Sequence, residues 1–164
     1  MIEYRTGDAT RPLGSGPRVI AHVCNDIGGW GRGFVVALSK RWSQPEAAYR
    51  KWHAEPTDPP FELGQAIFVE VEPELWVANM IGQHDVRTFD GIPPVRYEAI
   101  ARAMSRVTAF AMQKHASVHM PRIGCGLPGG TWREVERVLY DVFDGTDLRA
   151  YVYDLPEAAS GDVS

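Results

Sequence analysis

Two glycine-rich stretches carry the residues whose types and spacing point most directly to chemistry. Residues 22–33 contain Gly28, Gly29, Gly31 and Gly33, and residues 120–132 contain Gly124, Gly126, Gly129 and Gly130. Each stretch follows an apolar strand candidate and precedes a helix candidate. Unpaired backbone N–H groups and a helix start attract anions, and glycine lets the backbone approach a phosphate closely. The pair of loops therefore predicts a ligand with two phosphates, held from both sides.

The glycine spacing excludes two common phosphate motifs. Neither loop is followed by the Gly-Lys-Ser/Thr of a P-loop, and neither has the spacing of a dinucleotide-binding fingerprint. Taken singly, each loop has an alternative interpretation as a tight turn. The presence of both at strand-to-helix junctions favours a ligand site. We call residues 26–33 loop one and residues 121–131 loop two.

Apolar periodicity and chain breakers predict the elements that must position these loops. Strands are expected at 2–6, 18–24, 65–71, 75–81, 117–120 and 148–155, and helices at 34–42, 46–53, 96–115 and directly after Thr131. Pro73 between two strand candidates indicates a hairpin. Thr131 and Glu134 fit a capping box, which specifies a helix start.

Strands and helices alternate along most of the chain, which predicts an α/β fold. We expect three α/β/α layers around a mixed, mostly parallel sheet, with a ligand crevice at the carboxyl ends of the strands. Residues 1–156 are expected to form a single domain, and residues 157–164 a flexible C-terminal tail.

Composition narrows the functional class. The chain has 164 residues, 45% hydrophobic and 23% charged, as in an ordinary water-soluble domain. Its net charge of −4 argues against generic nucleic-acid binding. No apolar run is long enough for a membrane span and no targeting segment is evident, so a cytoplasmic location is expected. Cys24 and Cys125 are expected to stay reduced, and Cys125 lacks an evident histidine partner for nucleophilic chemistry.

With the loops placed, the chain resembles the macrodomains, the ADP-ribose-binding fold. It is most similar to the subclass that contains terminal ADP-ribose protein glycohydrolase, the DNA ADP-ribosyl glycohydrolase antitoxins and the macrodomain of a chromatin-remodelling helicase. The resemblance covers nearly the whole chain. The matching segments are His22-Val23, Trp30-Gly31-Arg32-Gly33, residues 78–84 (Ala-Asn-Met-Ile-Gly-Gln-His) and residues 116–127 (Ala-Ser-Val-His-Met-Pro-Arg-Ile-Gly-Cys-Gly-Leu).

The resemblance implies a role for each matching position. Asp8, beside Ala9, would accept a hydrogen bond from the adenine amino group, and Tyr153 would lie near the adenine. Asn25 would hydrogen-bond the distal ribose. Alternatively, Asp8 is only a turn residue, Tyr153 a core aromatic and Asn25 a cap for its loop. The diphosphate would be held by two backbone runs: Gly29, Trp30, Gly31, Arg32 and Gly33, and Ile123, Gly124, Cys125, Gly126 and Leu127.

Two departures from the subclass bear on catalysis. Its glycohydrolases have a lysine nucleophile where this chain has Gln83, and one of them has an aspartate where this chain has Pro128. Glutamine has no nucleophilic amine and proline no titratable group, so covalent lysine catalysis is excluded. Asn25, Asp26, Gln83 and His84 are the candidates to position a water. Histidine alone among these side-chain types ordinarily titrates near neutral pH, although a loop histidine is often an ordinary surface residue.

Two functional hypotheses follow. The first is a hydrolase that removes mono-ADP-ribose from acidic protein side chains. DNA bases such as thymidine are a second candidate substrate. The reaction would use water and would not depend on a lysine. The alternative is a non-catalytic reader of ADP-ribose or its polymer, a role that the resemblance also supports because the helicase macrodomain shares the Gln-His pair. The expected partners are ADP-ribose and ADP-ribosylated protein or DNA, with no membrane, no cofactor and no metal, and the chain is expected to be a monomer.

Overall fold

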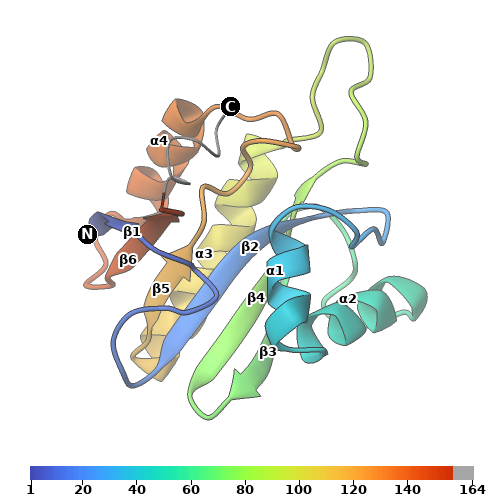
Figure 1. Cartoon of the computed structure of the whole chain (residues 1–164). Helices are drawn as coiled ribbons and strands as arrows, with labels where there is room; N and C mark the ends of the chain where they lie inside the picture. The colour runs from blue at the N-terminus through green and yellow to red at the C-terminus, as the bar shows by residue number, and fades with distance from the viewer. Residues whose placement is uncertain (157–164) are drawn as a thin grey trace.

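A computed structural model describes residues 1–156 of the chain (Figure 1). The predicted tail, residues 157–164, lies outside the described residues. The elements follow in the order β1 (Ile2–Thr6), β2 (Arg18–Asn25), α1 (Phe34–Arg41), α2 (Gln44–Ala54), β3 (Ala66–Glu72), β4 (Leu75–Gln83), α3 (Tyr97–Lys114), β5 (Ser117–Met120), α4 (Trp132–Phe143) and β6 (Ala150–Asp154). Every predicted strand and helix is present, with ends that differ by one or two residues at most positions.

The six strands form one sheet in the order β1-β6-β5-β2-β4-β3. All neighbouring strands run parallel except β3 and β4, which form the hairpin predicted around Pro73. The predicted mixed, mostly parallel sheet is therefore confirmed. Because parallel strands share a direction, the connections after β2, β4 and β5 emerge at one edge of the sheet, the upper edge in Figure 1.

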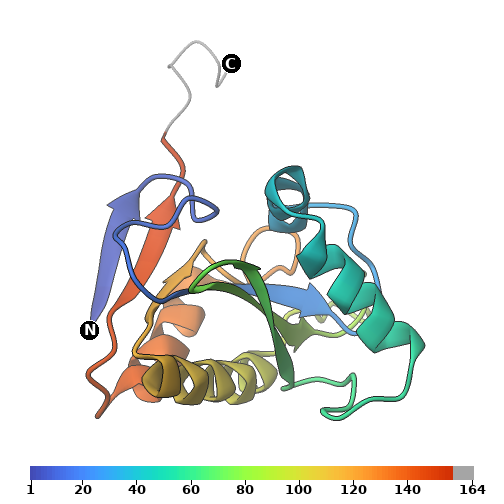
Figure 2. The same cartoon turned by 90° about the horizontal axis from the view of Figure 1, so that it is seen from below.

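Helices cover both faces of the sheet. In Figure 2, α3 and α4 (yellow-brown and orange) lie on one side, and α1 and α2 (blue to green) on the other. The period of two in β2 explains why both faces are apolar: Val19 and Ala21 enter the cluster under α3 and α4, whereas Ile20 and Cys24 enter the cluster under α1 and α2. The three-layer α/β/α architecture is confirmed.

The start of α4 lies where it was expected, but the predicted capping box does not form. Thr131 takes the N-cap position with an extended backbone and makes no side-chain capping bond. Its backbone N–H instead donates to the hydroxyl of Tyr97 at the start of α3, at 3.0 Å. A tertiary contact between two helix starts replaces the local motif.

Within residues 1–156, none of the helices combines the length and apolarity needed to cross a membrane.

Candidate functional site

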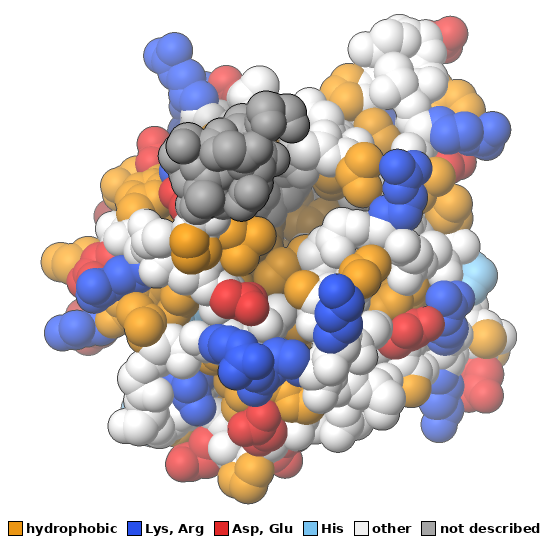
Figure 3. Space-filling view, viewed as in Figure 1, with side chains coloured by type: hydrophobic (Ala, Val, Ile, Leu, Met, Phe, Trp, Pro, Cys, Tyr) orange, Lys and Arg blue, Asp and Glu red, His pale blue; other side chains and the backbone are white. Residues whose placement is uncertain are grey.

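One pocket of about 660 Å³ opens at the carboxyl ends of β2 and β4. Loop one lines one side and loop two the other, and His22, Val23 and Cys24 of β2 lie beneath. In Figure 3 the same face of the molecule is hollowed near its centre, and hydrophobic side chains show in the hollow. The structure thus brings the two glycine-rich stretches, far apart in the sequence, to opposite walls of a single pocket.

Both walls offer unpaired backbone N–H groups. Among the described residues, the N–H groups of residues 31–35 in loop one and the start of α1 find no acceptor, and neither do those of Gly126 and Leu127 in loop two. The first turn of a helix leaves such donors unpaired, and Gly33 is the N-cap of α1. Donors on both sides of a pocket suit an anion that is held from two directions.

Loop one is held in shape by the side chain of Asn25. Its Oδ1 accepts the backbone N–H of Ile27 at 3.0 Å and of Gly29 at 2.9 Å, and its Nδ2 donates to the carbonyl of Gly29 at 2.9 Å. Asn25 also lines the pocket. The capping role left open by the sequence is therefore present, and the side chain still borders the space where a ligand would lie.

Loop two closes on itself and is attached to the neighbouring elements. The N–H of Gly130 donates to the carbonyl of Gly124 at 2.8 Å, and the N–H of Val95 donates to the carbonyl of Pro128 at 2.9 Å. The guanidinium of Arg122 forms two hydrogen bonds, of 2.6 and 2.9 Å, with the carboxylate of Asp154 at the end of β6. Arg122 also lines the pocket, so this ion pair ties the wall of the pocket to the sheet.

The candidate catalytic residues gather at one end of the pocket. Asn25 and Gln83 line it, and the Nε2 of Gln83 donates to the carbonyl of Asp85 at 2.9 Å. Their sequence neighbours Asp26 and His84 form a pair at the rim, outside the pocket-lining set: the Nδ1 of His84 donates to the Asp26 carboxylate at 2.8 Å. The other Asp26 oxygen accepts the N–H of Asp85 at 2.7 Å.

This pairing determines what the imidazole can do. With its proton on Nδ1 facing Asp26, neutral His84 carries its lone pair on Nε2, which has no partner among the described residues. The His84 side chain is half exposed, so water reaches it. An imidazole oriented by a carboxylate is the arrangement of a general base.

The residues expected around an adenine do not line this pocket. One Asp8 oxygen accepts both the N–H and the hydroxyl of Thr10 at 2.8 Å, as in a turn. Tyr153 is 4% exposed, and its hydroxyl accepts the N–H of Leu13 and lies 2.7 Å from Nδ1 of His119. Asp8, Ala9 and Tyr153 are not among the lining residues. The burial of Tyr153 agrees with the alternative of a core aromatic.

Several lining residues were not singled out from the sequence as site residues. They are His22, Val23, Cys24, Phe34, Val35, Val86, Arg87, Pro121 and Arg122. His22 is the clearest case: burial lowers its pKa to about 4, and its Nε2 lies 2.5 Å from Oδ1 of Asn79. A polar residue inside the apolar run of β2 was the signal available in the sequence.

The two cysteines lack the properties of nucleophiles. Burial raises the pKa of Cys24 far above the ordinary thiol value, and burial also raises the pKa of Cys125. A raised pKa keeps a thiol protonated and unreactive. Within residues 1–156 no three His, Cys, Asp or Glu side chains are grouped to hold a metal ion.

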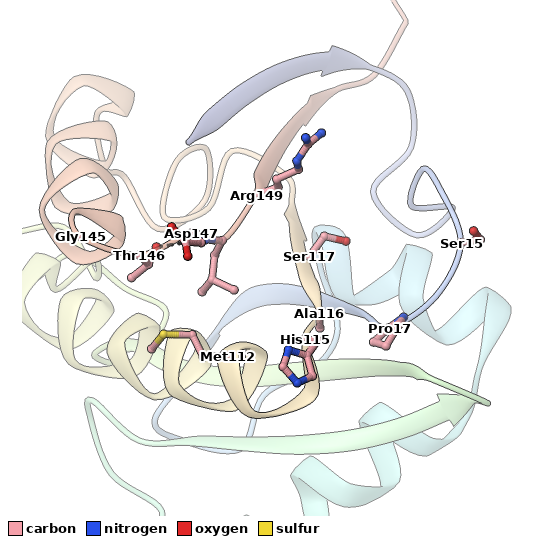
Figure 4. A pocket seen from close by; sticks show the side chains of 11 residues that line it. Ser15, Pro17, Met112, His115, Ala116, Ser117, Gly145, Thr146, Asp147 and Arg149 are labelled. Atoms are coloured by element: carbon pink, nitrogen blue, oxygen red, sulfur yellow. Dashed lines mark hydrogen bonds between the residues drawn. The ribbon is translucent and has the colours of Figure 1, made fainter.

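A second cavity, of about 590 Å³, lies at the opposite end of the sheet (Figure 4). Its walls come from the end of α3, the start of β5 and the connection between α4 and β6. Figure 4 shows His115, Ser117 and Arg149 around it. It contains none of the candidate site residues. Its lining does not favour a ligand of one charge, because the acidic Asp147 and the basic Arg149 both border it.

The chain is similar to the solved structure of a macrodomain protein from Streptomyces coelicolor, with 53% identity and a TM-score of 0.83 over 94% of this chain and 99% of that one. No family model matches. Chromodomain-helicase-DNA-binding protein 1-like of Mus musculus is 28% identical over 166 residues, which cover 96% of this chain but 18% of the mouse protein.

Two further relatives have names that describe an activity. An ADP-ribose 1''-phosphate phosphatase of Candida albicans is 26% identical over 93% of this chain and 99% of its own length. An ADP-ribose glycohydrolase of Bos taurus is 33% identical over 60 residues, which are 36% of this chain and 40% of that protein.

Proposed function

The chain belongs to the macrodomain family, and from this premise we propose that it binds ADP-ribose and hydrolyses the bond between ADP-ribose and acidic side chains of proteins. The proposal that the chain binds ADP-ribose rests on the unpaired N–H groups in the two walls of the pocket. They belong to residues 31–35 on one side and to Gly126 and Leu127 on the other. A diphosphate between them would accept hydrogen bonds from both loops.

The proposed orientation follows from what borders each end of the pocket. Asn25 and Gln83 line the end of the pocket that lies beside Asp26 and His84. Because the reacting carbon belongs to the distal ribose, we assign this end to that ribose. Asp8, Ala9 and Tyr153 would serve the adenine only if the nucleoside extends past the pocket toward the end of β1. The names of the Candida albicans and Bos taurus relatives, both of which refer to ADP-ribose, support the ligand class.

The proposed reaction needs no covalent intermediate with the protein. A water adds to C1″ of the distal ribose, the bond from C1″ to the ester oxygen breaks, and the carboxylate leaves with the bonding electrons. The transition state resembles an oxocarbenium ion, as in other glycosidic cleavages. The proton lost by the water passes to a base, either Nε2 of His84 held by Asp26 or a phosphate oxygen of the substrate itself.

A reader without catalysis is the second candidate, and two observations favour it. Gln83 has no nucleophilic group, and the Asp26–His84 pair lies at the rim rather than in the lining of the pocket. The similarity to part of a chromodomain-helicase protein agrees with such a role. In this case the same pocket would bind ADP-ribose on a modified protein and leave the ester bond intact.

The test uses the full chain and a protein that carries mono-ADP-ribose on glutamate and aspartate. Release of free ADP-ribose is followed over time, and calorimetry with ADP-ribose runs alongside. DNA with ADP-ribosylated thymidine and ADP-ribose 1″-phosphate, the substrate named for the Candida albicans relative, serve as second and third substrates.

Release from the modified protein would support the hydrolase. Release of ADP-ribose from the DNA alone would indicate that the substrate is a nucleobase linkage. Release of phosphate from ADP-ribose 1″-phosphate alone would indicate a phosphatase. Binding without release from any of the three would make the protein a reader. A protein that does not bind ADP-ribose would contradict both candidates.

A further inference from the structure

Tyr49 of α2 lies beneath loop one without lining the pocket. It is fully buried, and its ring packs against Trp30 of loop one at 5.2 Å and against Phe61 at 5.5 Å, centroid to centroid. Its hydroxyl lies 2.6 Å from the backbone carbonyl oxygen of Asn25 and 2.9 Å from Oδ1 of the same residue. One side chain therefore contacts both the body of loop one and the residue at its start.

The orientation of the Asn25 amide is settled by its neighbours. Oδ1 accepts two backbone N–H groups, those of Ile27 and Gly29, and Nδ2 donates to the carbonyl of Gly29. A flipped amide would place its NH₂ against two donors. Burial also raises the pKa of Tyr49 far above its ordinary value, so its hydroxyl stays protonated and acts toward Asn25 as a donor.

This arrangement leaves Asn25 with one group to offer a ligand. An amide nitrogen carries two hydrogens, and Gly29 takes one of them. The second has no acceptor among the described residues, and Asn25 borders the pocket. The direction of that hydrogen is set by the contacts of Oδ1 and of the backbone of Asn25, including those to Tyr49.

We propose that Tyr49 is a positioning residue, which holds the side-chain amide of Asn25 in its ligand-binding arrangement before ADP-ribose arrives. It acts through Asn25 on the distal ribose and does not touch the ligand. The inference rests on the proposed function, since it requires that the distal ribose lie beside Asn25. A side chain ordered in advance loses less freedom on binding, so such a contact raises affinity without touching the ligand.

The test replaces Tyr49→Phe, which removes the hydroxyl and keeps the ring between Trp30 and Phe61. We expect the affinity for ADP-ribose to fall about three- to tenfold, the usual effect of one hydrogen bond. The affinity for ADP, which lacks the distal ribose, should change less than about twofold. Tyr140→Phe is the matched control, because Tyr140 is 54% exposed on α4, and it should alter neither affinity.

A double-mutant cycle shows whether Tyr49 acts through Asn25. If Tyr49 acts through the side-chain amide of Asn25, Tyr49→Phe adds no further loss of ADP-ribose affinity to Asn25→Ala. Losses that add, or equal losses for ADP-ribose and ADP, would overturn the proposal, because they would mean that Tyr49 only supports the fold of loop one.

A measurement without ligand separates this inference from the proposed function. We expect the N–H of Gly29 to exchange with solvent faster in Tyr49→Phe than in the unaltered protein, because the amide that pairs with it is held less firmly. Unchanged exchange would overturn the positioning role even if ADP-ribose binds. Failure of the unaltered protein to bind ADP-ribose would instead contradict the proposed function, and the proposal that rests on it, before any variant is made.

Discussion

Single residues in the pocket and at its rim fall into two groups: those that could hold a ligand and those that could move a proton. The unpaired backbone N–H groups of residues 31–35 and of Gly126 and Leu127 can donate hydrogen bonds to a ligand, and Gln83 has no titratable group. In the proposed reaction, proton transfer by the protein would depend on the pair of Asp26 and His84, joined at 2.8 Å. Binding and catalysis can be tested separately because different residues would serve them.

Asp26→Asn tests whether His84 is the base. The amide keeps an oxygen for the N–H of Asp85 but removes the negative charge that faces the Nδ1–H of His84. If His84 accepts the proton of the water, the rate of ester hydrolysis should fall about 100-fold, the lower range for lost general-base catalysis, with unchanged affinity for ADP-ribose. Asp90→Asn, in the exposed part of the 84–95 connection, is the control. An unaltered rate would assign the base to the phosphate of the substrate.

Gly33→Ala tests the backbone of loop one. Gly33 has φ 85° and ψ −147°, a region that is accessible almost only to glycine, and it is the N-cap of α1. The strain should move the adjacent N–H groups and lower the affinity for ADP-ribose at least about fivefold, as a strain of about 1–3 kcal/mol allows. Gly145→Ala is the matched control: its φ is also positive, at 76°, and it borders the second cavity at the opposite end of the sheet. Calorimetry that finds equal affinities for the two variants would contradict the role of loop one.

Among the elements, the approach of α3 to β4 sets one edge of the pocket. Gly82, next to Gln83, lets α3 pack closely: a Cβ there would lie 2.8 Å from Cγ1 of Ile100 and 3.0 Å from Cγ1 of Val23. The carbonyl of Gly82 also accepts the N–H of Arg96 at 2.9 Å, just before α3 begins. A small residue at this position of β4 therefore fixes where the helix and the following loop lie.

Gly82→Ala should lower the free energy of unfolding by about 1–3 kcal/mol, the usual cost of an inserted methyl group in a packed core. Urea unfolding measures this. Gly7→Ala is a suitable control, because a Cβ there would meet Tyr153 at an ordinary 3.5 Å. Equal stability of both variants would show that α3 can shift without cost.

For the molecule as a whole, two buried histidines link stability to pH. Burial lowers the pKa of His22 to about 4 and that of His119 to about 3. Unfolded histidine titrates near pH 6.5, so below that value the unfolded chain binds protons that the folded chain excludes. The stabilising effect is full above about pH 6.5 and is lost as the pH falls toward 4 and 3.

We therefore expect the free energy of unfolding to fall between pH 6.5 and 4, with a slope of about 1.4 kcal/mol per pH unit from each of these histidines. Urea unfolding at several pH values and constant ionic strength measures the slope. His119→Gln should reduce it, and His115→Gln, at an exposed position, should not. A slope that His119→Gln leaves unchanged would contradict the assignment.

Much of the fold follows from short-range patterns. The apolar runs and the breaker Pro73 predict the strands, the hairpin and the helices, because each depends on residues that are close together in the sequence. The capping box at Thr131 failed for the opposite reason: the hydroxyl of Tyr97, 34 residues earlier, took the N–H of Thr131.

The sequence by itself determined the α/β class, the order of the elements and the two glycine-rich loops, since glycine content and periodicity are local properties. The tertiary structure decided which groups meet. Tyr49 contacts Asn25 across 24 residues, Arg122 contacts Asp154 across 32, and His84 contacts Asp26 across 58. Such pairings depend on how helices pack on the sheet, and packing is decided by the burial of side chains from the whole chain at once.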